Sequence, residues 1–417
     1  MSRLSIYEIN TAVWLGGHSL AEVPARRWDA IAALPVDAVW LMGVWQRSPA
    51  GLAIAAADEG LSSSFRQAVA DLRPSDVIGS PYCVRDYVVD ERFGGREALA
   101  VARRELAARG LRLILDYVPN HVAPDHPWLA SHPEYFIPGS EEELAERPAD
   151  FARTAGGIVA RGRDPYFPPW PDVVQLDAFS DGLRSAVAET LVDVGAQCDG
   201  LRCDMAMLMT NEVFSRTWNV RAPAEEFWPA LIGRVQWTHP GLLFIAEAYW
   251  DMEYTLQQQG FDYCYDKRLY DRLVERGDVR GHLVAGLDYQ EKLVRFIENH
   301  DEPRAASVFG PEQARAAAVV MSTLPGARLY HDGQLSGKRT KIPVFLGRGP
   351  AEPPDADLRA FYAWLLPRAA KLSGSWRLLD SDAPLVSWAW DDDVVVVNLS
   401  DSPAGGLEPW GYKLPFG

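Results

Sequence analysis

Three acids and one arginine stand out in this sequence because each follows an apolar stretch typical of a buried strand. Arg202 and Asp204 lie two positions apart, so both side chains would point to the same face of a strand. An arginine beside an aspartate favours the ionised carboxylate. A positioned, ionised carboxylate is what covalent catalysis at a sugar carbon requires, and a buried structural ion pair is the alternative interpretation.

Similar polar clusters end other apolar stretches. Residues 116–121 (DYVPNH), Glu247 and residues 298–301 (ENHD) each follow such a stretch, whereas Tyr82 and Asp86 lie in a segment that we expect to be a loop. Any one of these residues could simply cap a loop or pair with a helix. Acids gathered at three strand ends are harder to explain structurally, because like charges placed close together cost free energy.

Predicted strands and helices alternate along most of the chain. The strands are expected at residues 5–15, 36–42, 111–118, 200–204, 241–247, 261–264, 293–298 and 327–330. The helices are expected at residues 23–34, within 52–72, and at 95–109, 180–197, 225–238, 267–276, 279–289, 311–323 and 356–372. This alternation predicts an α/β fold with a parallel sheet, most simply a closed (β/α)8 TIM barrel, with a doubly wound open sheet as the alternative. In a barrel the carboxyl ends of the strands form the catalytic face, where the acids would meet.

Two segments break the alternation. Residues 123–175 are rich in proline, glycine and charge, which predicts an irregular insertion after the third strand. Residues 374–417 predict a short C-terminal β appendage, with a hairpin that turns at the three aspartates 391–393. The barrel itself is therefore expected to consist of residues 1–122 and 176–373.

The composition of the chain argues against several classes of function. The 417 residues carry a net charge of −16, which argues against nucleic acid or an anionic membrane as a partner. No apolar run approaches the roughly 18 residues of a membrane span. The N-terminus lacks the apolar region of a secretory signal, and the four cysteines show no metal-ligand spacing. We therefore expect a cytoplasmic protein with reduced thiols.

The polar clusters resemble, in order and spacing, the four sequence regions of the α-amylase family (glycoside hydrolase family thirteen). The matching segments are residues 116–121, 200–204, 246–247 and 298–301. The insertion lies where that family carries its domain B, and the resemblance covers nearly the whole predicted barrel. It implies a retaining α-glycoside hydrolase that acts on α-glucosides or short α-glucans, with an oligosaccharide or glucoside as substrate.

The resemblance also implies a role for each matching residue. Asp204 would be the nucleophile, Glu247 the general acid and then base, and Asp301 the residue that stabilises the transition state. The substrate-binding side chains would be Tyr82, Asp86, His121, Arg202 and His300. Retention requires one ionised and one protonated carboxyl, roughly 5–5.5 Å apart, which is the separation predicted for Asp204 and Glu247.

The sequence departs from the family pattern at three positions. Met207 and Leu208 occupy the places of a Lys-His pair that contacts the leaving group in starch-cleaving members, which argues against endo-cleavage of starch. Cys83 replaces an aspartate that is typical of exo-acting α-glucosidases. A transglycosylase or glucanotransferase that uses the same covalent step is the alternative function.

Two other function classes remain as alternatives. One is a non-catalytic carbohydrate-binding barrel, and the other is a phosphate-binding barrel, with Gly333 and Gly337 as candidate loop residues. No cofactor is required for the chemistry that we expect. Calcium is possible, with Asn120 as a candidate ligand and Asp164 or Asp172 as partners.

Overall fold

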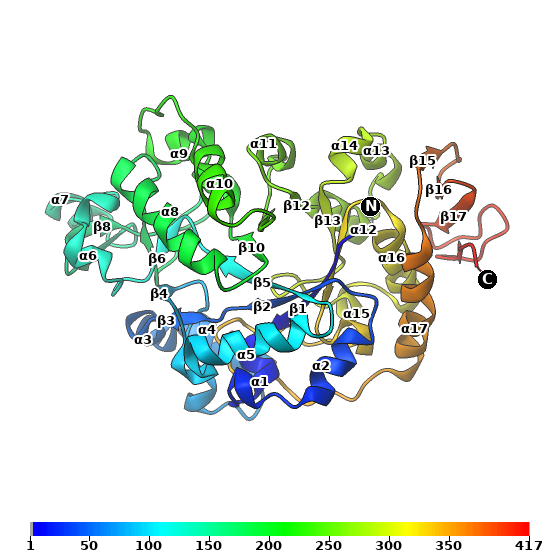
Figure 1. Ribbon diagram of the computed structural model, residues 1–417, viewed down its shortest axis with the longest axis horizontal. Coiled ribbons are helices and arrows are strands. Elements are labelled where there is room, and N and C mark those ends of the chain that lie inside the picture. The colour runs from blue at the N-terminus through cyan, green and yellow to red at the C-terminus, as the bar shows by residue number, and fades with distance from the viewer. Residues whose placement is uncertain (1–2, 417) are drawn as a thin grey trace.

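The chain forms a closed barrel of eight parallel strands that is surrounded by helices (Figure 1). The computed structural model describes residues 3–416. The barrel strands are β1 (Ser5–Asn10), β2 (Ala38–Met42), β5 (Arg112–Tyr117), β10 (Gly200–Cys203), β11 (Leu243–Ala246), β12 (Tyr263–Tyr265), β13 (Leu293–Arg295) and β14 (Ala327–His331). Because β1 pairs in parallel with both β2 and β14, the sheet closes, and the predicted (β/α)8 barrel is confirmed over an open sheet.

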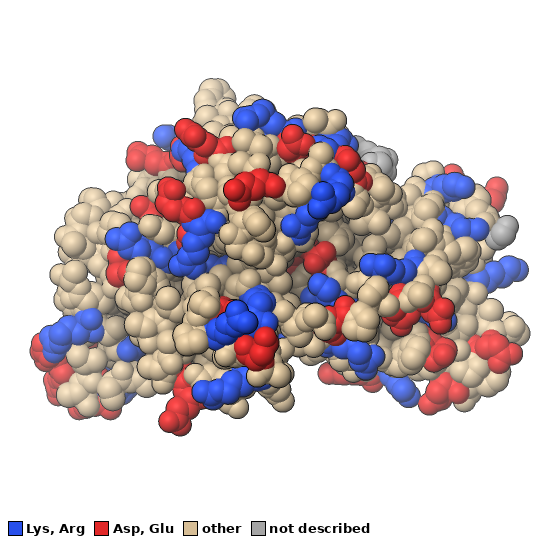
Figure 2. Space-filling view, turned by 90° about the horizontal axis from the view of Figure 1, so that it is seen from below, with Lys and Arg blue, Asp and Glu red and all other residues tan. Residues whose placement is uncertain are grey.

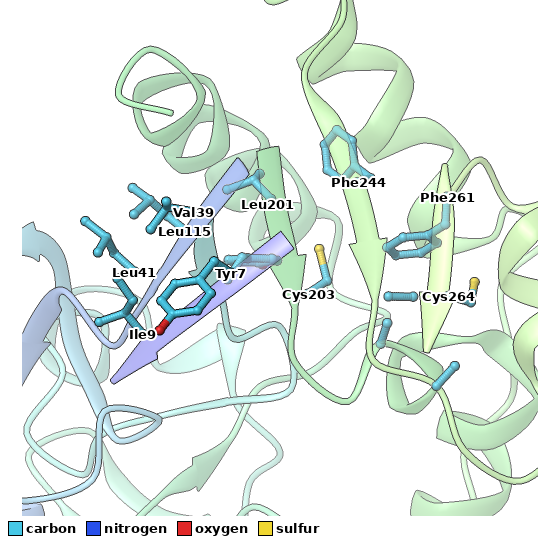
Figure 3. Packing of buried hydrophobic residues seen from close by; sticks show 14 of the residues in the cluster. Tyr7, Ile9, Val39, Leu41, Leu115, Leu201, Cys203, Phe244, Phe261 and Cys264 are labelled. Atoms are coloured by element: carbon cyan, nitrogen blue, oxygen red, sulfur yellow. The ribbon is translucent and has the colours of Figure 1, made fainter. Parts of the chain in front are cut away.

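The helices cover the outside of this barrel. The long ones are α2 (Ala25–Ala32), α5 (Gly95–Ala107), α8 (Asp181–Gly195), α10 (Phe227–Thr238), α12 (Lys267–Glu275), α16 (Pro311–Thr323) and α17 (Ala356–Lys371). Leu201 and Cys203 of β10 belong to the buried cluster shared by strands and helices, with Phe244 of β11 beside them (Figure 3). Since neighbouring strand residues face opposite ways, Arg202 points into the barrel interior.

Two sequence expectations on the N-terminal side were wrong. The strand predicted over residues 5–15 ends at Asn10, because the Asn10 side chain accepts a hydrogen bond from the backbone N–H of Val13 and caps helix α1 (Thr11–Leu15). The segment expected to be a loop around Tyr82 contains strand β4 (Val84–Val89). This strand pairs with β3 (Trp45–Arg47), a partner too distant in sequence for a local pattern to show.

The helix expected within residues 52–72 is in fact two helices. They are α3 (Pro49–Ala57) and α4 (Glu59–Ala68), separated by Asp58. The Asp58 side chain accepts a hydrogen bond from the backbone N–H of Leu61, so it starts the second helix where the first one ends.

The segment between β5 and α8 is largely irregular. Its short strand β6 (His121–Val122) pairs with β9 (Val174–Gln175), so the chain enters and leaves the segment at the same place. Between them lie a hairpin, β7 (Phe151–Thr154) with β8 (Gly157–Ala160), and the short helices α6 (Trp128–Ser131) and α7 (Glu141–Glu146). The domain boundaries proposed from the sequence stay predictions.

The C-terminal residues form an antiparallel sheet at one end of the molecule (Figure 1). Its strands are β15 (Trp376–Leu379), β16 (Leu385–Trp390), β17 (Asp393–Asn398) and β18 (Tyr412–Lys413). Pairing of β16 with β17 confirms the hairpin that turns at the acidic residues. The indole N–H of Trp390 donates to the backbone carbonyl of Thr323, so this sheet packs on the barrel helix α16.

One face of the molecule carries side chains of both charges. Figure 2 shows a face on which basic and acidic side chains are interspersed. Within residues 3–416, no helix combines the length and the hydrophobicity needed to span a membrane. All four cysteines lie in the described part of the chain, where they are buried and unpaired.

Candidate active site

A cavity of about 290 Å³ opens at the carboxyl ends of the barrel strands. The residues that line it are Ser80, Tyr82, His121, Trp170, Asp172, Val173, Asp204, Met205, Glu247, Tyr249, Asp301 and Phe345. The cavity thus brings together the three acids that follow β10, β11 and β13. It also contains two of the predicted substrate-binding residues, Tyr82 and His121.

Arg202 joins the acids at the base of this cavity. Its Nη1 atom lies 2.6 Å from Oδ1 of Asp204, and its Nη2 atom lies 2.8 Å from Oε2 of Glu247. Nη1 is also 3.7 Å from Oδ1 of Asp116 on β5. The arginine side chain is 1% exposed. One buried guanidinium therefore balances carboxylates from three neighbouring strands, where only the pair with Asp204 was predicted.

The turn after β10 holds the two acids in place. The backbone N–H of Asp204 donates to the carbonyl of Tyr117 on β5. Met205 has a left-handed backbone (φ 41°), which is uncommon for a residue other than glycine and is often found at functional sites. In this conformation its N–H donates to Oε2 of Glu247 at 2.6 Å, and the hydroxyl of Tyr249 donates to Oε1 at 2.8 Å.

Burial and the surrounding charges shift the pKa of Asp204. Burial, with the negative charge of Glu247, raises the pKa of Asp204 to about 8, although Arg202 opposes the shift. The expectation that Arg202 keeps Asp204 ionised does not agree with this shift, because burial outweighs the attraction of the guanidinium, which also contacts Glu247.

His300, which follows β13, links Asp301 to the barrel interior. Its Nε2 atom lies 2.8 Å from Oδ2 of Asp301 and 2.7 Å from the Tyr82 hydroxyl, and its Nδ1 atom lies 2.5 Å from Oε1 of Glu8. Burial disfavours the imidazolium, but Asp301 and Glu8 outweigh it and raise the pKa of His300 to about 10. Asp301 is 44% exposed, and, although desolvation opposes the shift, His300 holds its pKa well below the usual range.

Aromatic rings form the remaining walls of the cavity. The ring of Tyr82 stacks on His300 at a centroid distance of 5.4 Å, and His121 of β6 lies 5.1 Å from Trp170. Burial lowers the pKa of His121 to about 4, so its imidazole is neutral and can both donate and accept a hydrogen bond. Sequence reasoning missed Trp170 and Tyr249. The only local signal for Trp170 was an aromatic residue within a proline-rich stretch.

One predicted substrate-binding residue does not line the cavity. Asp86 lies on β4 opposite Gln46 of β3, and the residues that line the cavity do not include it. Met207 and Leu208 are fully buried in the turn η5 (Ala206–Met209), so they pack in the core rather than face a leaving group.

The residues suggested for calcium do not fit such a site in this arrangement. Oδ1 of Asn120 accepts a hydrogen bond from Gln175, and Oδ1 of Asp164 accepts from the backbone N–H groups of Tyr166 and Phe167. Across residues 3–416, no three His, Cys, Asp or Glu side chains gather in a metal-binding arrangement. No step proposed below uses a metal.

The fold and the site define this protein as a (β/α)8 barrel with an acidic, aromatic-walled pocket on its catalytic face. The family model for the α-amylase catalytic domain matches residues 25–166. This part of the chain is therefore similar to the α-amylase catalytic domain.

Curated relatives include hydrolases and transferases. The chain is 26% identical over 351 residues to α-amylase MalA of Haloarcula japonica, a match that covers 80% of this chain and 44% of that protein. It is 27% identical over 256 residues to α-1,4-glucan:maltose-1-phosphate maltosyltransferase 2 of Streptomyces coelicolor, covering 60% and 32%. The chain thus spans less than half the length of either relative.

Solved structures share the fold across nearly the whole chain. The cyclic α-maltosyl-(1→6)-maltose hydrolase of Arthrobacter globiformis in its ligand-free form matches with a TM-score of 0.69 at 17% identity. That match covers 99% of this chain and 97% of the other.

Proposed function

We propose that the chain is a retaining α-glycosidase that acts on α-glucosides or short α-glucans through a covalent glycosyl-enzyme intermediate. The observation that carries this proposal is the contact of one guanidinium, that of Arg202, with both Asp204 and Glu247. A retaining mechanism needs one ionised carboxylate as nucleophile and one protonated carboxyl as acid. We assign Asp204 as the nucleophile and Glu247 as the acid, and the guanidinium of Arg202 holds both side chains at the same end of the cavity.

In the first step, the carboxylate of Asp204 attacks the anomeric carbon while Glu247 protonates the departing glycosidic oxygen. The bond to the leaving group breaks and an ester to Asp204 forms. In the second step, ionised Glu247 takes a proton from water, the water oxygen attacks the anomeric carbon, and Asp204 is released. The negative charge of Asp301, at the mouth of the cavity, stabilises the oxocarbenium-like transition states.

The surroundings of the cavity support a substrate longer than one sugar. A second hollow of about 520 Å³ shares Asp301 and Phe345 with the pocket of the three acids. Its far wall consists of α4 and residues 340–345. A chain of sugar units that fills the acid pocket can therefore continue into this hollow.

Transglycosylation is the second candidate. The Streptomyces relative is named as a maltosyltransferase, and the first half-reaction is the same in both activities. The two differ only in whether water or a sugar hydroxyl resolves the ester. Phosphate binding is disfavoured, because Gly333 and Gly337 flank a three-residue turn, η6 (Gln334–Ser336), rather than the start of a long helix.

The test is hydrolysis of maltooligosaccharides, sucrose, trehalose and starch, with the product anomer followed by NMR. We expect the α-anomer to appear first, and added acceptor sugar to reveal any transfer. Asp204→Asn should reduce kcat by at least about 10³-fold, as loss of a nucleophile does. The matched control is Asp193→Asn, a surface acid paired with Arg96. Initial release of the β-anomer, or an unchanged Asp204→Asn variant, contradicts the proposal.

A further inference from the structure

A buried acid on β1 lies directly behind His300. Glu8 is 0% exposed and, like Ile6 two residues earlier, it faces the barrel interior. Its Oε1 atom lies 2.5 Å from Nδ1 of His300 and accepts a hydrogen bond from the His300 backbone N–H at 3.3 Å. Its Oε2 atom has no hydrogen-bond partner among the described residues. The hydrogen bonds of the Glu8 side chain are therefore made with His300.

The two nitrogens of His300 face two different carboxylates. Nδ1 faces Glu8 and Nε2 faces Asp301, with the Tyr82 hydroxyl also within 2.7 Å of Nε2. A neutral imidazole has one N–H donor and one lone pair, so it could donate to only one of the carboxylates. The hydrogen-bond partner of Nε2 is the Tyr82 hydroxyl, and Asp301 lies beside Nε2 as an ion pair. Carboxylates on both sides of the ring therefore favour the charged form.

We propose that Glu8 is a positioning residue, which holds His300 as an imidazolium so that its positive charge orients the Asp301 carboxylate at the cavity. The inference deepens the proposed glycosidase function and rests on it. Glu8 would act without touching the substrate. Its effect would pass through a relay of contacts, from Glu8 on β1 through His300 to Asp301 at the mouth of the pocket.

The charges around this relay come from several elements. The titratable and charged groups that face it are His331 of β14, Asp116 of β5, Arg202 of β10, Tyr265 of β12 and Lys341. Burial opposes ionisation of Glu8, but His331 and His300 lower its pKa below the usual value. This direction agrees with the ionised carboxylate that the relay requires.

The experiment removes the negative charge of Glu8 and keeps the size and shape of the side chain. Glu8→Gln retains an oxygen that can accept from Nδ1 but removes the negative charge. We expect the ring pKa of His300, followed by NMR and assigned with a His300→Gln variant, to fall by at least about one unit. We expect kcat to fall about 10²-fold, since a small misplacement of a reacting group has that effect, while KM changes little.

The matched control is Tyr7→Phe on the same strand. Tyr7 faces the helix side of β1, where its hydroxyl donates to Asp332, so the His300 titration and kcat should stay as in the parent. An unshifted His300 titration in Glu8→Gln overturns the proposal. If that variant does not fold, the parent protein still decides, because a His300 ring that becomes neutral below pH 7 also overturns it. Neither NMR readout needs a substrate, so failure here is distinct from failure of the glycosidase proposal.

Discussion

The Nη2 atom of Arg202 lies 2.8 Å from Oε2 of Glu247, while the other branch of the guanidinium contacts Asp204. This bridge predicts that lysine cannot replace the arginine, because a single ammonium cannot span both carboxylates. We expect Arg202→Lys to lower kcat/KM by at least about 10²-fold and to lower the melting temperature, since one carboxylate would be left buried and unpaired. The control is Arg96→Lys, whose exposed pair with Asp193 contributes little. Wild-type kinetics in Arg202→Lys would contradict the bridging role.

Stability should fall as pH rises through the weakly acidic and neutral range. The pKa of Asp204 is raised to about 8 by burial and by Glu247, against about 3.9 in the unfolded chain. Between these values the folded state binds a proton that the unfolded state does not, so the free energy of unfolding decreases with increasing pH. Asp204→Asn removes this proton and should make the curve less steep, while the slope from His300, whose pKa is raised to about 10, remains in the variant.

The clearest window for that measurement is between about pH 6 and about pH 8. Asp116, whose burial raises its pKa to about 6, contributes only below this window and remains in the variant. Urea unfolding at several pH values would show the difference. Equal pH slopes for the parent and for Asp204→Asn would rule out a proton bound by Asp204 in the folded state at these pH values.

Activity should rise with pH where Asp204 loses its proton. Only the ionised carboxylate of Asp204 can attack the anomeric carbon, and burial raises the pKa of this group to about 8. We expect kcat/KM to increase with pH up to about pH 8, in a profile measured at constant ionic strength. A kcat/KM that does not change between about pH 6 and about pH 8 would contradict this expectation.

Trp170, in the wall of the cavity next to His121, should affect substrate binding more than the chemical step. Trp170 lies 5.1 Å from the His121 ring and lines the pocket, so its flat face is available to a sugar ring. We expect Trp170→Ala to raise KM about tenfold with a smaller change in kcat. Trp237→Ala is the control, because this tryptophan of α10 is 88% exposed. An unchanged KM in Trp170→Ala would remove that residue from the binding surface.

Met207 should not tolerate the polar residue found at its position in starch-cleaving members. Its side chain is completely buried in the turn after β10. A lysine there would bury an unpaired charge, and we expect Met207→Lys to lower the free energy of unfolding by about 3 kcal/mol or more. Met207→Leu, which conserves volume, should cost less than about 1.5 kcal/mol. A fully stable Met207→Lys protein would show that this turn can open toward the pocket.

The sequence pattern predicted the barrel and the meeting of the three acids for a physical reason. In parallel strands the side-chain period is two and the carboxyl ends share one face, so the sequence alone assigns Arg202 to the interior and Asp204 to the rim. The neighbours of an interior side chain depend on strands far away in sequence. Sharing of Arg202 between two acids could therefore not be predicted, and neither could the contact of Glu8 with His300.

The remaining errors arose where one side chain decided the local structure. Asn10 turned the end of a predicted strand into a helix cap, and β4 found a distant pairing partner in β3. Asp86 was expected to bind substrate because it was placed in a loop near Tyr82. As part of β4 it is held opposite Gln46 instead.

The two-residue ladder of β6 with β9 gives the segment after β5 a narrow neck. His121 lies in this neck. Residues at the base of the segment therefore fix the position of His121 beside the barrel, and the outer part of the segment does not. Changes to the hairpin of β7 and β8 should therefore leave the position of His121 unchanged.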